Sequence, residues 1–439
     1  MGSTPESMHE QWLKRHKAVM PKWLSLYYDS PIELVSGDGR HVVDRDGKRY
    51  LDFFGGILTT MTGYNVKEVV SAITEQASNM VHSSTLYLIS PMIELAEEIA
   101  ALSGIENPRV FFTTSGTEAN DTALMLATAY RGTNQILAVR NSYHGRSPSA
   151  LSITGNIHYR VNAYSPFQVS YVLGGSRLRG PLAQLDDEEY IRRGVLDVED
   201  VLQTQTNGNV AALIAEPIQG VGGFAVPPDG YFGEIKKALD SSGALYISDE
   251  VQTGWGRTGE HFWGYGAQGV RPDMITFAKG IGNGLALAGV VAKAEIMDSL
   301  HASSISTFGG SPLAAAGGLA NLRYLLANNL QDNALKMGSL IARRLQEARS
   351  EMSAVADIRG KGLMIGVELC EPGTVTPSHR RANLVMENAK SKGVLVGKGG
   401  LSGNVLRVAP PLSITEEEAT FGVETLVEAL KFGSSEALS

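Results

Sequence analysis

Two apolar runs, ALYIS and MITFA, constrain the fold of this chain more than any other feature of its sequence. Runs that are apolar at nearly every position are typical of strands buried on both faces of a parallel sheet. The first run is followed by Asp249 and the second by Lys279, and turn-forming residues come next in both cases. The sequence therefore predicts a buried sheet that presents a carboxylate and an amine at the carboxyl ends of its strands.

This pair of side chains suits a particular cofactor, pyridoxal phosphate. The aldehyde of that cofactor condenses with a lysine amine, and its ring nitrogen stays protonated only beside a carboxylate. Asp249 and Lys279 lie 30 residues apart (279 minus 249). The alternative interpretation is that both are ordinary exposed charges at strand ends, because Asp and Lys side chains are usually exposed.

Composition excludes several classes of protein. The 439 residues are enough for two or three domains with a large buried core. There are 38 basic and 46 acidic residues, a net charge of −8, and no long basic run, so we expect no nucleic-acid partner. No apolar run approaches the roughly 18 residues that a membrane helix needs. We therefore expect a protein that does not contact a membrane.

The single cysteine and the amino terminus indicate where the protein works. Cys370 is the only cysteine, which excludes an internal disulfide and suits a reducing compartment. The first 23 residues lack the apolar core of a secretory signal, and Glu6 and Glu10 argue against a transit peptide. We expect a plain amino-terminal helix and a cytoplasmic protein.

A glycine-containing turn follows another apolar strand in RVFFTTSGTEAN. Its residues Ser115, Gly116 and Thr117 precede a helical stretch. Glycine lets the backbone approach a ligand closely, and the free amides and dipole of a helix start favour a phosphate. The alternative is a plain strand-to-helix turn in which Ser115 only caps the helix.

Two more strands end in side chains of interest. QILAVRNS leads to Tyr143 and His144, and NVAALIAEPIQGVGG leads to Glu216 and then a glycine-rich loop. An aromatic face is the surface on which a pyridine ring can stack, although a tyrosine at a strand end is more often a packing residue.

Other segments give local predictions. Residues 32–54 predict a small sheet with tight turns, and the glycine-rich, charged residues 174–194 predict a solvated excursion. Ser90 is expected to cap a helix that has Pro91 in its first turn. The apolar stripe of that helix comprises Met92, Leu95, Ala96, Ile99 and Leu102. A capping box from Thr415 to Glu418 is expected to begin the last helix.

The strings SDEVQTGWGRTG and FAKGIGNG resemble the signature of class III aminotransferases, the ω-aminotransferase branch of fold-type I pyridoxal-phosphate enzymes. Further matches extend from about Val42 to Thr415. The resemblance implies an α/β fold, with a mainly parallel sheet between helices in a large domain and a smaller α/β domain built from both termini. We expect residues 1–60 and 321–439 to form the small domain and residues 61–320 to form the large, cofactor-binding domain.

The resemblance also implies roles for individual residues. Lys279 would bind the cofactor covalently and move a proton, and Asp249 would keep the ring nitrogen protonated. Thr307, in ISTFGGSPL, would bind the cofactor phosphate of a partner subunit, which implies a homodimer with shared active sites. The remaining cofactor contacts implied by the resemblance are those of Ser115, Gly116 and Thr117 with the phosphate, Tyr143, His144 and Val251 with the ring region, Gln252 with the ring hydroxyl, and Glu216 beside them. No metal is expected.

Substrate binding is expected to centre on Arg407 in LRVAPPL. Arginine binds carboxylates bidentately, and this residue matches the arginine that holds the α-carboxylate in the family. The alternative interpretation is that Arg407 is a strand residue that forms an ion pair at the surface. Relatives that act on ornithine or 4-aminobutyrate carry QGEGG, whereas this chain has QGVGG with Val221. Arg146 could bind a distal carboxylate, and Leu58 and Tyr87 complete the expected substrate contacts.

EHFWGY, AKGIGNG and IRGKGLMIGVEL resemble the alanine–glyoxylate aminotransferase 2 group most. The resemblance implies transfer of an amino group from an amino acid, ω-amino acid or amine to a small keto acid, pyruvate or glyoxylate, in two half-reactions. A lyase or decarboxylase of the same fold, of the dialkylglycine decarboxylase or amino-alcohol phosphate lyase type, would also retain Asp249 and Lys279. A non-enzymatic binding protein would be expected to lose Lys279.

Overall fold

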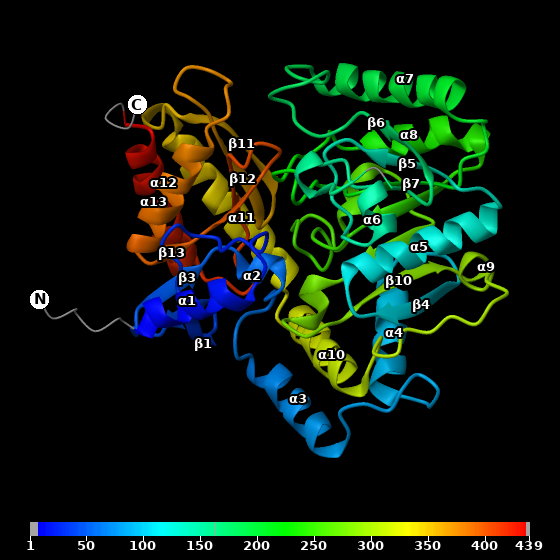
Figure 1. Cartoon of the computed structure of the whole chain (residues 1–439), viewed down its shortest axis with the longest axis horizontal. Coiled ribbons are helices and arrows are strands. Elements are labelled where there is room, and N and C mark those ends of the chain that lie inside the picture. The colour runs from blue at the N-terminus through cyan, green and yellow to red at the C-terminus, as the bar shows by residue number, and fades with distance from the viewer. Residues whose placement is uncertain (1–7, 163, 436–439) are drawn as a thin grey trace, which may run out of the picture.

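The computed structural model describes residues 8–162 and 164–435, and its centre is a seven-stranded sheet (Figure 1). The strand order is β4-β10-β9-β8-β7-β5-β6. Strand β10 runs antiparallel to both of its neighbours, and the pairs from β9 to β6 are all parallel. The strands are β4 (Pro108–Thr113), β5 (Gln135–Val139), β6 (Gln168–Val172), β7 (Ala212–Ala215), β8 (Leu245–Asp249), β9 (Met274–Phe277) and β10 (Ala288–Lys293).

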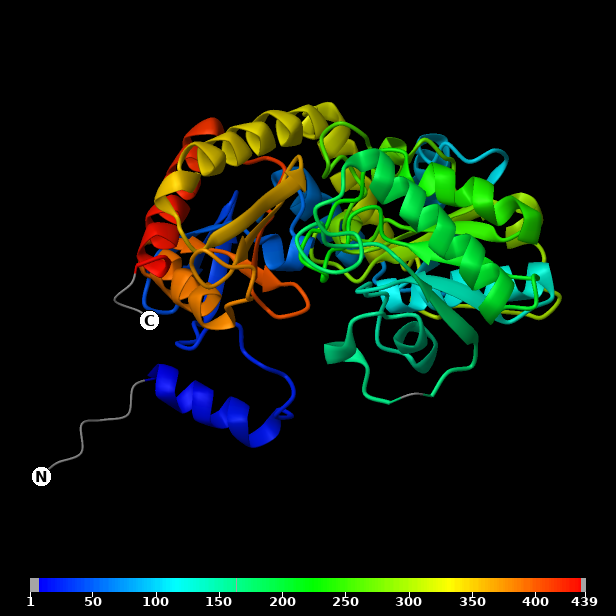
Figure 2. The same cartoon turned by 90° about the horizontal axis from the view of Figure 1, so that it is seen from above.

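The apolar runs of the sequence are the centre of this sheet. Every residue of β5, β7, β8 and β9 is buried, so the prediction of strands covered on both faces is confirmed. Because side chains alternate along a strand, neighbouring residues pack into different layers. Ile136 of β5 packs against helix α5 (Gly116–Arg131), whereas Leu137 packs against α7 (Asp187–Gln205) and α8 (Tyr231–Leu239). Helices therefore cover both faces (Figure 2).

Helix α7 corrects the prediction that residues 174–194 form a solvated excursion. The helix begins at Asp187, and Asp186 caps it by accepting a hydrogen bond from the Glu189 amide. Acidic residues at a helix start interact favourably with the helix dipole, so this charge cluster stabilises a helix rather than a loop. The buried residues of α7 are Tyr190, Gly194, Val198 and Val201, a helical spacing that extends beyond the predicted segment.

Two four-stranded sheets lie outside the large sheet. The first joins β1 (Leu34–Asp38), β2 (His41–Asp44) and β3 (Arg49–Asp52) to β13 (Val394–Leu395), so the sheet predicted for residues 32–54 is confirmed and gains one strand. The second has the order β11-β12-β15-β14, with bounds Val355–Lys361, Met364–Leu369, Val405–Val408 and Gly397–Gly399. Because β13 pairs with β3, segments near both ends of the chain share a sheet. The domain division at residues 60 and 320 stays a prediction.

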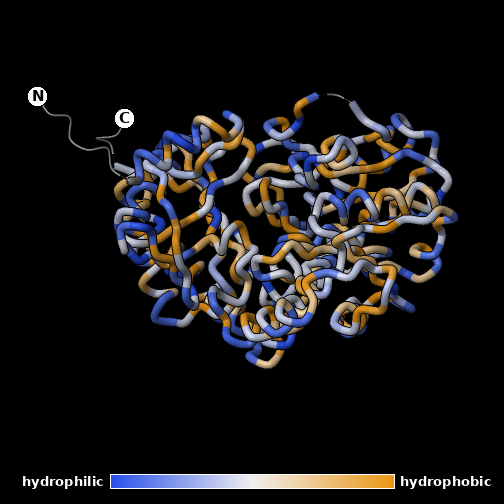
Figure 3. Tube along the Cα trace, turned by 60° about the horizontal axis from the view of Figure 1, so that its bottom comes forward, coloured by the Kyte–Doolittle hydropathy of each residue, from blue (hydrophilic) through white to orange (hydrophobic). Residues whose placement is uncertain are grey.

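Helices near the termini accompany these small sheets. Helices α11 (Leu330–Glu347) and α12 (His379–Ser391) both pack against α13 (Glu416–Gly433), which begins with the predicted capping box of Thr415 and Glu418. Helix α1 (Met8–Val19) is the expected amino-terminal helix. In Figure 3, hydrophobic stretches of the chain alternate with hydrophilic ones in both halves of the molecule. The other helices are α2 (Gly55–Leu58), α3 (Lys67–Asn79), α4 (Ser90–Leu102), α6 (Pro148–Ser152), α9 (Ala294–Met297) and α10 (Pro312–Ala327).

The start of α4 differs from its prediction by one residue. Ile89, rather than Ser90, is the capping residue, because its carbonyl accepts the hydrogen bonds of the Met92 and Ile93 amides. Ser90 is therefore the first helical residue. Leu95 and Ile99 of the predicted stripe are buried, and its other members, Met92, Ala96 and Leu102, are partly buried against the same core. None of the described helices has the length and apolar character required to cross a membrane.

Candidate active site

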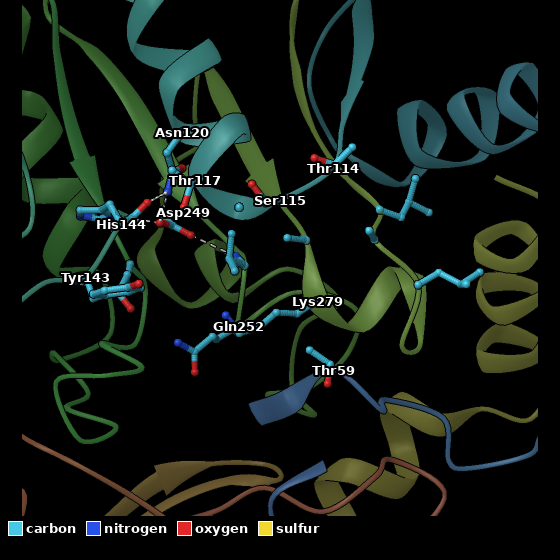
Figure 4. Close-up of a pocket in the computed structure, with 18 of the residues that line it drawn as sticks. Thr59, Thr114, Ser115, Thr117, Asn120, Tyr143, His144, Asp249, Gln252 and Lys279 are labelled. Atoms are coloured by element: carbon cyan, nitrogen blue, oxygen red, sulfur yellow. Dashed lines mark hydrogen bonds and ion pairs between the residues drawn. The ribbon is translucent and has the colours of Figure 1, made fainter. Parts of the chain in front are cut away.

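A cavity of about 430 Å³ lies at the carboxyl ends of the parallel strands. Residues that follow β4, β5, β7, β8 and β9 line it, because parallel strands end at the same edge of a sheet. Figure 4 shows side chains from these separate segments around one space. Of the predicted residues, the cavity wall includes Ser115, Gly116, Thr117, Tyr143, His144, Glu216, Asp249, Val251, Gln252 and Lys279.

Asp249, the last residue of β8, is buried, and its carboxylate has three hydrogen-bond contacts within the chain. Its Oδ2 accepts a hydrogen bond from Asn120 Nδ2 at 2.8 Å and lies 2.7 Å from His144 Nδ1. Its Oδ1 accepts one from the Val251 amide at 3.1 Å. Burial of a carboxylate is tolerated when such partners are present. The network holds this carboxyl group at a fixed position beside the cavity.

Asn120 also lines the cavity, and the sequence analysis did not identify it. Its Oδ1 accepts a hydrogen bond from the Thr276 hydroxyl at 2.7 Å, which orients the amide so that Nδ2 faces Asp249 and the His144 carbonyl. Asn120 lies four positions after Gly116 in α5, and side chains four apart share a helix face. That spacing could have identified Asn120, whereas nothing in the sequence relates it to Thr276 in β9.

Lys279 follows β9 and has a left-handed backbone conformation, with φ of 49°. Such conformations are costly for non-glycine residues and are found often at functional sites. Burial lowers the pKa of the Lys279 amine; the carboxylates of Asp249 and Glu216 oppose this effect, and the cation of Arg407 adds to it. A lower pKa increases the fraction of neutral amine, which is the form that attacks an aldehyde.

The start of α5 forms one end of the cavity. Ser115 caps the helix, its hydroxyl accepting a hydrogen bond from the Glu118 amide at 3.2 Å. A Cβ atom at Gly116 would lie 3.1 Å from the Val251 side chain, a tight contact that requires the valine to shift. The free amides and the dipole of this 16-residue helix therefore face the cavity without obstruction, an arrangement that suits an anion.

Glu216 follows β7 and closes another side of the cavity. Its two carboxylate oxygens accept hydrogen bonds from the Tyr143 amide at 3.0 Å and the Gly220 amide at 2.8 Å. Burial raises the pKa of Glu216 to about 7, against the opposing influence of His144. The carboxyl group thus fixes the glycine-rich loop to the segment that carries Tyr143.

The residues present fit pyridoxal phosphate. Lys279 offers an amine, Asp249 an anion, and the start of α5 a phosphate site. Among the described residues, the buried Gln252 Oε1 and His144 Nε2 have no hydrogen-bond partner within the chain, so both have capacity for a ligand. The Tyr143 ring adds an aromatic wall, which the Tyr159 ring contacts edge-on with 4.8 Å between centroids.

The other predicted site residues do not line this cavity. Arg407, in β15, is 4% exposed and donates a hydrogen bond to the Gly220 carbonyl, next to Val221. Leu58 is buried in an apolar cluster with Phe54, Ile218 and Phe224, although its neighbour Thr59 does line the cavity. Arg146 lies 5.6 Å from the Trp23 ring. Thr307 is exposed, and Tyr87 is 70% exposed.

Comparison with known proteins agrees with this geometry. The family described as "Aminotransferase class-III" matches residues 27–430. "Alanine--glyoxylate aminotransferase 2 homolog 2, mitochondrial" of Arabidopsis thaliana is 38% identical, over 96% of this chain and 86% of the relative. A leucine/methionine racemase of Thermococcus litoralis is 37% identical, over 96% of this chain and 95% of its own.

A solved structure of a transaminase is also similar to this chain. An amine transaminase from an uncultivated Pseudomonas species, crystallised in its PLP-bound form, superimposes with a TM-score of 0.86 at 31% identity. The match covers 92% of this chain and 95% of the transaminase. The α/β fold of the fold-type I enzymes is thereby confirmed, and pyridoxal phosphate is the cofactor. The chain belongs to the class III aminotransferase family.

Proposed function

We propose that this aminotransferase uses a small keto acid, pyruvate or glyoxylate, as the acceptor for an amino group taken from an amino acid, ω-amino acid or amine. The observation that carries this proposal is the environment of Arg407. Its side chain is buried, and no carboxylate in the described parts of the chain forms an ion pair with it. A buried cation without a counter-ion is costly, and a substrate carboxylate supplies one.

Each residue of the cavity has a separate role in the proposed reaction. Bound pyridoxal phosphate would supply an aldehyde that takes up the amino group and a ring that accepts the electron pair left on the α-carbon when its proton is removed. Lys279 carries the amine that holds the cofactor and then moves the proton. Asp249 supplies the negative charge beside the ring nitrogen, Gln252 the hydrogen bond to the ring hydroxyl, and the start of α5 the phosphate site.

Acceptor specificity tests the proposal. We expect the wild type to prefer pyruvate to acetaldehyde, which is pyruvate without its carboxylate, and Arg407→Ala to lose most of that preference in kcat/KM. Arg407→Lys keeps the charge but not the forked donors, and should fall between the two. Equal loss of kcat/KM for the acid and the aldehyde in Arg407→Ala would show that Arg407 does not select the carboxylate.

The products formed from the amino donor alone distinguish transamination from the alternative reactions. A lyase or decarboxylase would use the same Asp249 and Lys279, and the 37% identical relative from Thermococcus is named as a racemase. Incubation of the holoenzyme with an amino donor and no acceptor decides between them. Transamination leaves the cofactor as its amine together with one equivalent of keto acid. Inversion of the donor without keto acid would instead indicate racemisation.

We further propose a homodimer and a cytoplasmic location. The exposed apolar residues Met80, Val81, Leu86, Tyr87 and Leu88 lie in one segment, and Ile305 and Phe308 flank the exposed Thr307. Surfaces of this kind support burial against a second copy. The single cysteine supports a reducing compartment. The Arabidopsis relative is named as mitochondrial, so fractionation of cells that produce the full chain is the appropriate test.

A further inference from the structure

Two consecutive tyrosines attach the amino-terminal segment to the strands that carry the Arg407 site. The Tyr27 hydroxyl donates a hydrogen bond to the Lys398 carbonyl at 2.6 Å and accepts one from the Lys398 amide at 2.8 Å. The Tyr28 hydroxyl makes the same pair of bonds with Val396, at 3.2 Å to the carbonyl and 3.1 Å from the amide. The two side chains therefore attach the segment in equivalent ways.

Only Tyr27 also reaches Arg407. The Arg407 Nη2 group donates a hydrogen bond to the Tyr27 hydroxyl at 3.3 Å. A phenol has one donor and two acceptor positions, so the hydroxyl of Tyr27 is saturated by Lys398 and Arg407. The Tyr27 ring stacks on the Phe54 ring with 5.5 Å between centroids, and the Phe54 ring lies 4.8 Å from Arg407 Cζ. Tyr27 thus contacts the arginine directly and supports the aromatic ring beneath it.

The other partners of Arg407 are neutral as well. Its Nε donates a hydrogen bond to the Lys398 carbonyl at 3.1 Å, and its Nη1 donates to the Gly220 carbonyl at 3.4 Å. The Phe224 ring lies 5.7 Å from Cζ. These groups orient the guanidinium but leave its charge without a counter-ion within the described residues. The described residues accept hydrogen bonds from three of the five N–H groups of the side chain, which leaves two without a partner among them.

A second phenol lies near the same charge. Burial raises the pKa of Tyr159, whereas the positive charge of Arg407 lowers it. Tyr159 in turn contacts Tyr143 on the cavity wall. Among the tyrosines of the described structure, Tyr27 is the only one whose hydroxyl has a direct hydrogen bond with the Arg407 guanidinium.

We propose that Tyr27 is a specificity-determining residue, which holds the guanidinium of Arg407 in the orientation that receives a substrate carboxylate. The inference rests on the proposed function, because it assumes that Arg407 binds that carboxylate. Loss of the hydroxyl frees one end of the guanidinium, and a group that is not held in place binds less well. A hydrogen bond to a charged group has an effect on the order of tenfold.

The test compares single hydroxyl deletions at adjacent positions. Tyr27→Phe should raise KM for pyruvate about tenfold, with kcat changed less than about threefold and kcat/KM for acetaldehyde nearly unchanged. Tyr28→Phe removes an equivalent pair of bonds to the backbone without touching Arg407, and should leave the acid-to-aldehyde ratio as in the wild type. Calorimetric titration of each holoenzyme with propanoate, which cannot react, should show weaker binding only for Tyr27→Phe. The cofactor dissociation constant should be the same in all three proteins.

Three results would overturn the inference. An equal loss in Tyr28→Phe would mean that the tyrosines act only by attaching the segment. An unchanged acid-to-aldehyde ratio in Tyr27→Phe, with Arg407→Ala showing the expected loss, would leave the role of Arg407 intact and remove that of Tyr27. An unchanged ratio in Arg407→Ala would contradict the proposed function itself, and with it the role of Tyr27.

Discussion

Asp249 shows how single residues establish the chemistry of this site. Asp249 is 3% exposed, and its carboxylate is held by Asn120, His144 and the Val251 amide, so its position is fixed before a ligand arrives. A positioned charge of this kind stabilises a transition state without reorganisation at the moment of reaction. Substitutions in this network should therefore affect the rate of proton transfer more than the stability of the fold.

Asp249→Asn should slow the half-reaction with an amino donor by roughly 10²–10⁴-fold, because the loss of a buried charge partner typically costs about 3–5 kcal/mol. Stopped-flow absorbance of the cofactor measures the rate directly. An effect below about tenfold would show that Asp249 is not the partner of the ring nitrogen.

Asn120→Ala should slow the same step less, by about tenfold, because the carboxylate keeps its charge and loses one of its fixed donors. Thr276→Val tests the orientation of the amide, since it removes the hydroxyl that donates to Asn120 Oδ1. The pH dependence of the cofactor absorbance should shift in the same direction in both variants. A shift in Asn120→Ala alone would indicate that Thr276 does not orient the amide.

Lys279 should carry the cofactor, and its amine should react at lower pH in the folded chain than in the unfolded chain. Borohydride reduction followed by peptide mapping is expected to find the cofactor on Lys279, and Lys279→Ala should abolish that attachment. In cofactor-free protein, burial lowers the pKa of this amine, so an acylating reagent should label its peptide at a lower pH than after unfolding. A label on another lysine would contradict the assignment.

At the scale of elements, fully apolar runs predicted the strands of the large sheet most reliably. They predicted β8 and β9, and the parallel arrangement then placed Asp249 and Lys279 at one edge. The helix α7 was missed because its acidic first turn resembles a solvated loop in composition. The partners of Arg407 could not be predicted, since they come from Tyr27, Gly220 and Lys398, which no local pattern relates.

Two helix caps offer a matched test of the phosphate site. Ser115→Ala and Thr415→Ala each remove a side chain that accepts a hydrogen bond within the first turn, of α5 and α13 respectively. Each should lower the free energy of unfolding of the cofactor-free protein by about 1 kcal/mol. Only Ser115→Ala should also weaken cofactor binding, as measured by absorbance titration. Equal cofactor affinity in the two variants would show that Ser115 is a cap and nothing more.

At the scale of the whole molecule, two predicted site residues, Thr307 and Tyr87, are not among the residues that line the cavity in the single chain. Thr307 and Tyr87 are exposed, and both are flanked by exposed apolar side chains. The sequence could indicate Thr307 only through the family resemblance, because no pattern within one chain reveals a contact between copies. These positions are explained if each cavity is completed by a second copy.

Subunit mixing tests that arrangement. If each site combines Lys279 of one subunit with Thr307 of the other, a heterodimer of Lys279→Ala and Thr307→Ala chains contains one intact site and one doubly damaged site. Activity should therefore rise when the two inactive or weakened proteins are unfolded and refolded together. No gain over either parent, with heterodimer formation confirmed by mass, would contradict the shared site.

The pairing of β13 with β3 has a consequence for how the protein folds while the ribosome synthesises it. Leu51 is made early, but its partner strand residue Val394 emerges only when most of the chain has been synthesised. All seven strands of the large sheet lie before residue 294, so that sheet can begin to assemble while β3 is still without β13. Long-range pairings form late because their loop-closure cost must be met first. In a nascent chain arrested before Val394, the strands of the large sheet should therefore be protected from protease, while Tyr27 and the segment around it remain open to cleavage.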